Sequence, residues 1–465
     1  MKFYEVVIIG AGPAGLFCAL HLSKSSCKIK ELNSKILLID KNNHLGGVGA
    51  RTDGKLNLTT EIGMDINELC INKEFAEKII AYIDNYFNLE QNFELTGVDE
   101  NGIRNLSERL GREGLVLVSA KQRHMGTDRT FKVMKNFEKM LRDNNVEIWF
   151  NREVLDIKRN NGLFKIIFKE EIVCCRHLVV APGRSGSYWF RNIANNLRVD
   201  WKYGHIDIGL RVEFDASIFE EITKTIYDPK IKYTTSSHGD KVRTFCTNPN
   251  GFVTVEELED FKLVNGHAFS NKKSNNTNLA ILQTIGLHAP FADTTMYGRN
   301  LAKNVNLLGG NRPLLQRIGD LQRGRRTKYE RFYDYVNLEP TISYGNGSTE
   351  IKGAVTLGDI SMVYSKRLLD NLLEFLSKLD KVFPGIMHPQ TLIYAPEIKF
   401  YDTVYNTNQF METNIQNLFV AGDGVGKSRG IVGAALTGVL ASLGIISKFK
   451  KISAEEILKD FEEIV

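Results

Sequence analysis

The chain has 465 residues, of which 43% are hydrophobic and 25% charged, and 60 basic and 55 acidic residues give a formal net charge of +5. This length predicts two or three domains with enough material for hydrophobic cores. The composition is that of a globular protein and excludes a disordered or fibrous chain. A net charge this small does not by itself indicate a polyanionic partner.

The cysteines and the apolar runs indicate the cellular compartment in which the protein is expected. The six cysteines include no CxxC pair, and Cys174 and Cys175 are adjacent in a predicted strand, where they point to opposite faces. The first apolar run is itself a predicted strand, so no signal peptide is expected. The run at residues 431–446 is short for a membrane span and rich in Gly and Ala, which favours a buried helix. We therefore expect a cytoplasmic protein without a metal site or a membrane span.

The strongest signal lies at residues 4–15, where a buried-strand pattern is followed by Gly10, Gly12 and Gly15 and then by a helical pattern. In such a GxGxxG unit the first glycine makes a tight turn, the second lets the backbone approach a pyrophosphate, and the third lets the helix pack on the strand. The next strand, at residues 35–40, ends in Asp40, the acid expected to hold a ribose. The pattern predicts a Rossmann-like dinucleotide-binding domain, and a glycine-rich turn without a ligand is the alternative.

Further glycine-rich segments follow along the chain. Residues 45–58 contain Gly47 beside Arg51 and Lys55, whose side chains can extend toward a ligand, although a plain loop is the alternative. Residues 61–112 have amphipathic helical periodicity and are expected to be an insertion without visible chemistry. A buried strand at 177–181 leads into a glycine turn at 182–186.

The last part of the chain returns to the pattern of a nucleotide-binding unit. A strand at residues 417–421 runs into Gly422-Asp423-Gly424, and Gly430 opens a helix of small residues. An unrelated strand, turn and helix is the alternative. We expect the cofactor domain to combine residues 1–190 and 391–465, with a separate substrate domain at 191–390, where longer alternating strands and polar loops are predicted.

Taken together, these motifs resemble the bacterial FAD-dependent dehydrogenases, often labelled NAD(FAD)-utilising, of the glutathione-reductase-like two-dinucleotide superfamily. The resemblance spans nearly the whole chain. Besides the segments above, it includes Gly126-Thr127-Asp128 and the runs at 208–213, 244–251, 265–266 and 395–397. It implies an α/β fold: a Rossmann-like FAD-binding domain built from both chain ends, with an inserted α+β substrate domain. Departures from the family pattern at Arg184, Asn248 and residues 399–403 imply a substrate pocket unlike the usual one.

The residues expected to contact FAD lie on glycine turns, at strand ends or at helix N-termini. Asp423 is expected to bind the ribityl hydroxyls, and the helix that begins at Gly430 is expected to stabilise the negative charge of the reduced flavin. The full set is Gly10, Gly12, Pro13, Ala14, Gly15, Asp40, Gly47, Arg51, Lys55, Asp128, Ala181, Gly183, Gly422, Asp423, Gly430, Ile431 and Val432.

Four residues are candidates for substrate chemistry: Lys55, Arg184, Arg211 and Cys246. The alternatives are solvated surface charges and a buried structural cysteine. The cations favour a substrate that bears a carboxylate or phosphate. The lack of CxxC argues against a dithiol mechanism. The lack of a second GxGxxG unit leaves NAD(P)H only as a transient electron donor. The expected activity is that of a FAD-dependent oxidoreductase with flavin as hydride carrier.

Two other functions were weighed against this one. A flavoprotein acting on RNA, as some relatives that modify tRNA do, would use a basic run, although a solvated face or a lid over an anionic cofactor explains that run equally well. A non-catalytic flavin-binding protein is the third possibility. The sequence assigns no oligomeric state. The basic run consists of Arg312, Arg317, Arg323, Arg325, Arg326, Lys328 and Arg331.

Overall fold

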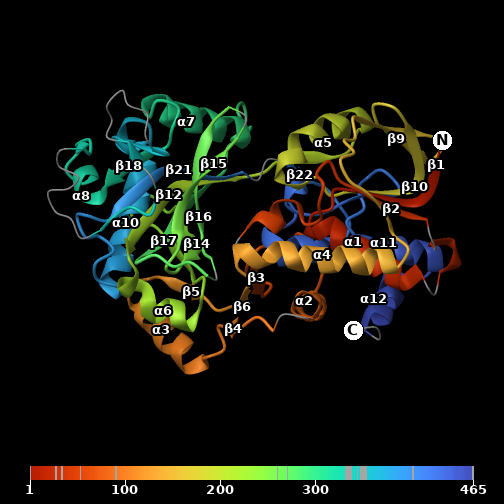
Figure 1. Ribbon diagram of the computed structural model, residues 1–465, viewed down its shortest axis with the longest axis horizontal. Helices are drawn as coiled ribbons and strands as arrows, with labels where there is room; N and C mark the ends of the chain where they lie inside the picture. The colour runs from red at the N-terminus through yellow and green to blue at the C-terminus, as the bar shows by residue number, and fades with distance from the viewer. Residues whose placement is uncertain are drawn as a thin grey trace. The chain divides into compact units, whose positions relative to one another are not determined.

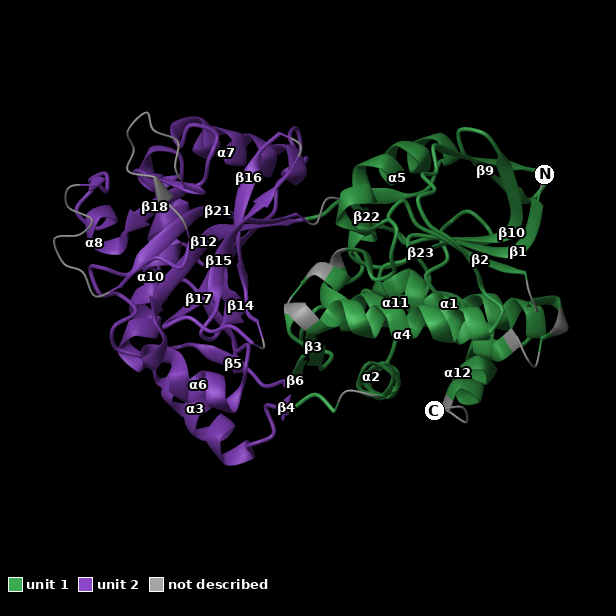
Figure 2. Ribbon diagram, viewed as in Figure 1, with its two compact units in different colours: residues 1–94, 123–204, 401–465 green, residues 95–122, 205–400 purple. Residues whose placement is uncertain are grey.

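The computed structural model describes residues 2–26, 29–32, 35–52, 54–89, 92–258, 260–269, 271–329, 338–342, 344–345, 353–400 and 403–462. The chain forms two compact units (Figure 2). The first comprises Met1–Glu94, Arg123–Gly204 and Tyr401–Val465, and the second comprises Leu95–Gln122 and His205–Phe400.

These limits differ from the predicted ones at 190 and 390. The reason is a two-stranded antiparallel sheet in the first unit, in which β11 (Trp201–Tyr203) pairs with β22 (Thr403–Tyr405). The chain therefore leaves the first unit only after residue 204 and re-enters it at 401. The predicted helical insertion at 61–112 is also divided, because α3 (Glu100–Arg112) packs through Leu106 and Leu110 into the core of the second unit.

The first unit contains a seven-stranded, largely parallel sheet (Figure 1). Its order is β7-β2-β1-β10-β9-β8, with β23 also paired to β10. In β1 six consecutive residues are buried, as a central parallel strand requires. β9 and β10 form the antiparallel hairpin that the sequence predicts. The strands are β1 (Lys2–Ile9), β2 (Ile36–Ile39), β7 (Glu147–Trp149), β8 (Asp156–Asn160), β9 (Leu163–Ile167), β10 (Ile172–Val180) and β23 (Leu418–Val420).

Helices cover both faces of this sheet. Val6 and Ile8 of β1 face a core shared with α1, α2, α4, α11 and α12, whereas Val7 and Ile9 face a core shared with α5. Of the described helices, α11 alone has the length and apolar composition to cross a membrane, and 89% of its most apolar window is buried within the protein. The helices are α1 (Pro13–Ser26), α2 (Lys73–Asn88), α4 (Thr127–Asp143), α5 (Gly183–Leu197), α11 (Gly430–Lys450) and α12 (Ala454–Glu462).

The second unit is built on a nine-stranded mixed sheet of order β19-β20-β18-β21-β12-β17-β14-β13-β5. Helices α3, α6, α7 and α10 pack against its apolar face, and β15 and β16 form a separate hairpin. The strands are β5 (Val116–Val118), β12 (Ile206–Asp215), β13 (Lys230–Thr234), β14 (Lys241–Asn248), β15 (Phe252–Glu257), β16 (Lys262–His267), β17 (Asn276–Ile285), β18 (Leu314–Arg317), β19 (Tyr344–Gly345), β20 (Val355–Leu357) and β21 (Leu392–Phe400). The helices are α6 (Glu220–Thr225), α7 (Thr294–Leu308), α8 (Ile318–Leu321) and α10 (Lys366–Val382).

β12 itself has one apolar and one polar side. Ile208, Leu210 and Val212 point into the helix-covered core, while Arg211 and Glu213 alternate with them and lie on the other side. This alternation is the one predicted from the sequence, and the α/β fold class is confirmed. The remaining short elements are η1 (Lys30–Leu32), η2 (Gly47–Arg51), β3 (Lys55–Leu58), β4 (Leu95–Thr96), β6 (Lys121–His124), η3 (Ala216–Phe219), η4 (Ile360–Met362) and η5 (Asp423–Val425).

Candidate cofactor site and a buried charge cluster

A cavity of about 270 Å³ opens at the carboxyl ends of the parallel strands in the first unit. Its walls come from the ends of β1, β2, β10 and β23, from residues 152–154 after β7, and from the first turns of α1, α5 and α11. Ligands bind at this edge in open parallel sheets, because the helices that follow the strands direct their N-termini there.

The three glycines of the first turn differ in what a side chain would meet. A Cβ on Gly10, whose φ is +97°, would lie 2.0 Å from the carbonyl oxygen of Ala181, and one on Gly15 would lie 1.9 Å from that of Gly10. A Cβ on Gly12 would have no atom within 4 Å, and Gly12 lines the cavity. Gly10 and Gly15 therefore serve the packing of the turn, while Gly12 keeps room for a ligand.

Asp40 lies at the end of β2 and lines the same cavity. Its Oδ2 accepts a hydrogen bond from the Ala11 amide at 2.7 Å, and its Oδ1 accepts from the Asn42 amide at 2.8 Å and from Asn42 Nδ2 at 2.9 Å. The carboxylate thus fixes the glycine turn to the second strand. Because a carboxylate offers about four lone-pair sites, it can also accept from a ribose hydroxyl.

Three helices begin at the cavity wall: α1 at Pro13, α5 at Gly183 and α11 at Gly430. The first-turn amides of such helices and the partial positive charge of each N-terminus suit a pyrophosphate. At α11 the charge is partly met by Asp423, whose Oδ2 accepts from the Gly430 amide at 3.2 Å and whose Oδ1 accepts from Ser428 Oγ at 2.9 Å. Asp423 therefore also stabilises the start of this helix, a role that the sequence did not indicate.

Most of the predicted cofactor residues lie on this cavity. Gly15 and Val432 do not line it, and Lys55 begins β3 and is half-buried. The side chains of Arg51 and Asp128 lie outside the part of the chain that the structure describes. The predicted residues that do line the cavity are Gly10, Gly12, Pro13, Ala14, Asp40, Gly47, Ala181, Gly183, Gly422, Asp423, Gly430 and Ile431.

Sequence reasoning missed two parts of the wall. Arg152, Glu153 and Val154 reach the cavity because β7 pairs with β2, which the order of strands along the chain does not reveal. Trp189 reaches it from the second turn of α5, four positions after Ser185, which also lines the wall. Its Nε1 is buried and has no hydrogen-bond acceptor among the described residues. The glycine turn, the acid, the three helix N-termini and this indole donor fit a dinucleotide cofactor.

Arg184 differs from the other candidate substrate residues in its surroundings. It lies in the first turn of α5, is exposed, and lines the cavity. It makes no hydrogen bond or ion pair with any other residue of the described chain. Its guanidinium is therefore available to an anionic ligand.

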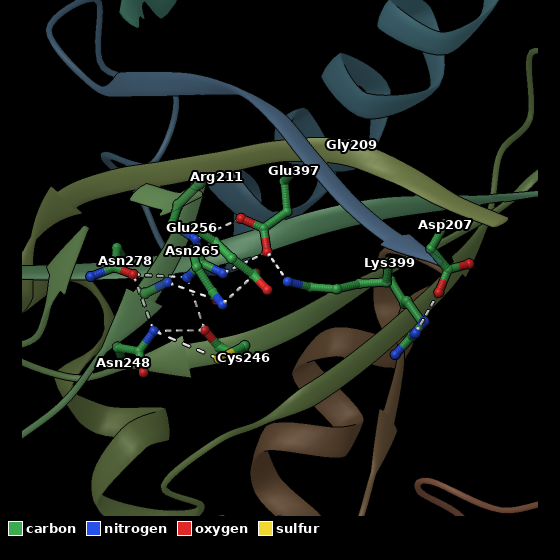
Figure 3. Close-up of polar contacts among 12 residues, drawn as sticks. Asp207, Gly209, Arg211, Cys246, Asn248, Glu256, Asn265, Asn278, Glu397 and Lys399 are labelled. Atoms are coloured by element: carbon green, nitrogen blue, oxygen red, sulfur yellow. Dashed lines mark hydrogen bonds and ion pairs between the residues drawn. The ribbon is translucent and has the colours of Figure 1, made fainter. Parts of the chain in front are cut away.

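Arg211, by contrast, is fully buried in the second unit and is occupied by protein groups (Figure 3). Its Nε and Nη2 each donate to a Glu397 carboxylate oxygen at 2.9 Å, and its Nη1 donates to Asn278 Oδ1 at 2.9 Å and to the Cys246 carbonyl at 3.2 Å. The expectation that Arg211 binds substrate is wrong in this state. A strand pattern shows on which side of a sheet a residue lies, but not that an acid 186 positions away will pair with it.

Glu397 is ionised at this centre. Burial by itself would raise the pKa of its carboxyl group, but the charges and hydrogen bonds of Arg211 and Lys399 lower this pKa below its ordinary value. Lys399 Nζ lies 2.7 Å from Glu397 Oε1. The result is a buried, hydrogen-bonded cluster of ions. Removal of one of its charged side chains would leave an uncompensated buried charge on another.

The backbone of Cys246 belongs to the same cluster. Its φ is +47°, and the register of β14 against β17 shifts between Phe245 and Asn248. This bulge turns the Cys246 carbonyl toward Arg211 and toward Asn248 Nδ2, which donates at 3.0 Å. The conformation of Cys246 thus has a structural explanation, while its half-buried thiol stays a predicted substrate contact.

Phe245 lies beside this cluster with three cations close to its ring. Lys230 Nζ is 4.9 Å, the Arg243 guanidinium 5.0 Å and Lys399 Nζ 5.6 Å from the ring centre. Each cation also contacts a carboxylate, as Lys230 does with Asp228 at 2.6 Å. The polar face of the sheet is therefore rich in charge but internally balanced.

Three of the seven residues of the basic run make contacts within the fold. Arg317 and Arg325 both contact the Asp320 carboxylate, at 3.0 and 2.8 Å, and Arg326 donates to the Leu357 carbonyl at 3.2 Å. Arg331 lies outside the described residues. These contacts give the three arginines structural roles and provide no support for RNA binding. The described residues also contain no cluster of His, Cys, Asp or Glu suited to a metal ion.

Comparisons with known proteins agree with the geometry of the cavity. Residues 205–399 match the family described as FAD-dependent protein, C-terminal domain-like, and residues 8–66 match the NAD(P)-binding Rossmann-like domain. An uncharacterized protein of Clostridium beijerinckii is 23% identical over 473 residues, which cover 95% of this chain and 81% of the relative.

Two solved structures are similar over most of their length. A geranylgeranyl bacteriochlorophyll reductase-like protein of Thermoplasma acidophilum is 12% identical with a TM-score of 0.43, covering 100% of this chain and 83% of that one. Glycine oxidase of Geobacillus kaustophilus is 11% identical with a TM-score of 0.43, covering 98% of this chain and 96% of that one. The two family matches support a FAD-dependent protein with a Rossmann-like domain and FAD as its cofactor.

Proposed function

We propose that this enzyme transfers a hydride between its flavin and a small molecule that carries a carboxylate or phosphate group. We further propose that it belongs to the NAD(FAD)-utilising dehydrogenases of the glutathione-reductase-like superfamily, which is supported by a cofactor unit assembled from both chain ends. FAD, when bound, supplies the redox chemistry, and the protein supplies orientation and charge.

The observation that carries the proposal is the guanidinium of Arg184 at the cofactor cavity, which has no hydrogen-bond or ion-pair partner among the described residues. An arginine there can form a bidentate contact with a carboxylate or phosphate, and the N-terminus of α5 adds partial positive charge beside it. NAD(P)H remains a proposed transient donor of electrons.

The test begins with the cofactor of the purified protein. We expect FAD, and not FMN, in the supernatant after denaturation. Stopped-flow reduction of the bound flavin is then measured with NADH, NADPH and a panel of carboxylates and phosphates, each paired with its neutral amide or ester. We expect reduction by at least one anionic compound and at least about tenfold slower reduction by its neutral partner.

Arg184→Gln separates the substrate role from a cofactor role. If Arg184 binds the substrate, KM for the anionic compound should rise about tenfold or more while FAD affinity is kept. Arg159→Gln, an exposed arginine on β8 in the same unit, is the matched control and should change neither. A loss of FAD affinity with unchanged KM would assign Arg184 to the cofactor and remove the support for an anionic substrate.

A further inference from the structure

The exposed face of α4, the helix labelled in Figure 1, carries lysines that form no ion pair with an acid among the described residues. Lys132, Lys135 and Lys139 are exposed and form no ion pair with any other residue in the described part of the chain. They lie three and four positions apart and so form one stripe on the helix. On three other helices, by contrast, lysines form ion pairs with acids one turn away. These pairs are Lys73–Glu77 and Lys78–Glu74 on α2, Lys224–Glu220 on α6 and Lys366–Asp370 on α10.

An exposed aromatic ring begins this stripe. Phe131 is 47% exposed, with Lys135 Nζ at 5.3 Å from its ring centre and the His44 ring at 5.8 Å. An exposed aromatic residue is a common anchor in protein interfaces, and here a lysine lies beside it. We call Phe131, Lys132, Lys135 and Lys139 the α4 stripe.

The inner face of the same helix is fastened to the wall of the cofactor cavity. Thr130 Oγ1 donates to the Ala50 carbonyl at 2.8 Å, and Met134 fills the space where a Gly46 side chain would lie. Ala50 belongs to η2, whose Gly47 and Gly49 line the cavity. The α4 stripe and the cofactor site are thus separated by about one helix diameter, roughly 10 Å.

We propose that the α4 stripe is the docking surface for an acidic one-electron carrier protein that supplies electrons to the flavin. The inference rests on the proposed redox function and adds its protein partner. Opposite charges would steer the carrier to the stripe, and a small, partly apolar contact suits a transient redox complex. Two reduced carriers each pass one electron to the flavin, which also takes up one proton from water, and the carriers leave oxidised. The reduced flavin then passes a hydride to the oxidised form of the small-molecule substrate.

Two other partners for a basic stripe fit less well. A membrane-surface helix needs a free apolar face, but Val133, Met134, Phe137 and Leu141 of α4 are buried in the core. Single-stranded RNA is usually held by several stacking rings along a basic groove, and the stripe offers only Phe131.

The experiment uses the FAD-loaded protein and an acidic [2Fe–2S] ferredoxin, reduced beforehand, as the probe. The rate of flavin reduction is followed by stopped flow from about 20 to about 300 mM salt. The test variant is Lys132→Glu/Lys135→Glu/Lys139→Glu. The control, Lys158→Glu/Lys169→Glu/Lys459→Glu, makes the same charge change at exposed lysines elsewhere in the first unit.

We expect the second-order rate to fall about tenfold or more in the test variant and to lose most of its salt dependence, with a much smaller change in the control. Phe131→Ser should also slow the reaction without changing its salt dependence. Equal losses in both triple variants would overturn the proposal, and so would tighter binding of the stripe to anionic vesicles or RNA than to the carrier. FAD content and reduction by dithionite report on the cofactor site separately, so failure of docking is distinguishable from failure of the redox function.

Discussion

Gly12 and Gly15 lie three positions apart, but we expect substitution of Gly12 to lower FAD affinity and substitution of Gly15 to lower the stability of the fold. Valine at position 12 would enter open cavity space, so Gly12→Val should fold normally and lose FAD affinity by about tenfold or more. Gly15→Ala would press against the Gly10 carbonyl and should destabilise the unit by roughly 1–3 kcal/mol. Flavin-to-protein absorbance ratios and thermal unfolding of the FAD-free proteins measure the two effects. A Gly12→Val protein with its full complement of flavin would contradict the assignment.

At the same scale, the sequence predicted those site residues whose role follows from short-range rules. The glycine turn and Asp40 depend on a strand, a turn and a helix that are contiguous in the chain. Val154 reaches the cavity only because β7 pairs with β2, so no local pattern marks it. Arg211 shows the converse error, because a cation in an alternating strand gave no sign of its burial against Glu397.

Among the elements, the start of α11 carries a second prediction. Asp423 places a carboxylate at the first amide of this helix and lines the cofactor cavity. A negative charge near a reduced, anionic flavin disfavours it, so Asp423→Asn should raise the flavin reduction potential while keeping the shape of the side chain. Ser428→Ala removes only the Ser428–Asp423 hydrogen bond and should leave the potential nearly unchanged. A dye-coupled reduction measures both, and an unchanged potential in Asp423→Asn would place the flavin ring elsewhere.

The periodicity of apolar residues correctly predicted that helices exist in this part of the chain. It did not predict which of the two units each helix packs into. The amphipathic pattern predicted helices across residues 61–112, and α2 and α3 are both found there. The pattern could not tell that α2 packs with α1 and α11 while α3 packs against the second sheet, because both present a similar apolar stripe. α4 begins at Thr127, since Gly126, with φ at +85°, forms its N-cap.

At the scale of the whole molecule, the two units shift the pKa values of their titratable groups by different physical effects. In the first unit, burial lowers the pKa of His21 and of His177 to about 4. Nδ1 of His21 bonds with Ser442 Oγ at 2.7 Å, and His177 packs against Phe449. In the second unit, burial would raise the pKa of Glu374, but hydrogen bonds from Ser237, Tyr233 and two backbone amides lower it to about 2.

These directions give the two units different sensitivities to acid. Below pH 6.5 the histidines of the unfolded chain become protonated, while His21 and His177 of the folded first unit stay neutral. The free energy of unfolding of the first unit therefore falls between pH 6.5 and about 4, by about 3 kcal/mol for each histidine. Glu374 stabilises the second unit above its ordinary pKa of 4.5, and this contribution is lost only as the pH falls toward 2. Acidification from pH 7 to pH 5 should therefore weaken the first unit selectively. Hydrogen exchange of the FAD-free protein, analysed separately for each unit, measures this loss of stability. His177→Phe should make the stability of the first unit less dependent on pH. The control, His238→Gln on an exposed turn of the second unit, should not. Parallel loss of protection in both units over this range would show that the buried histidines do not control the acid response.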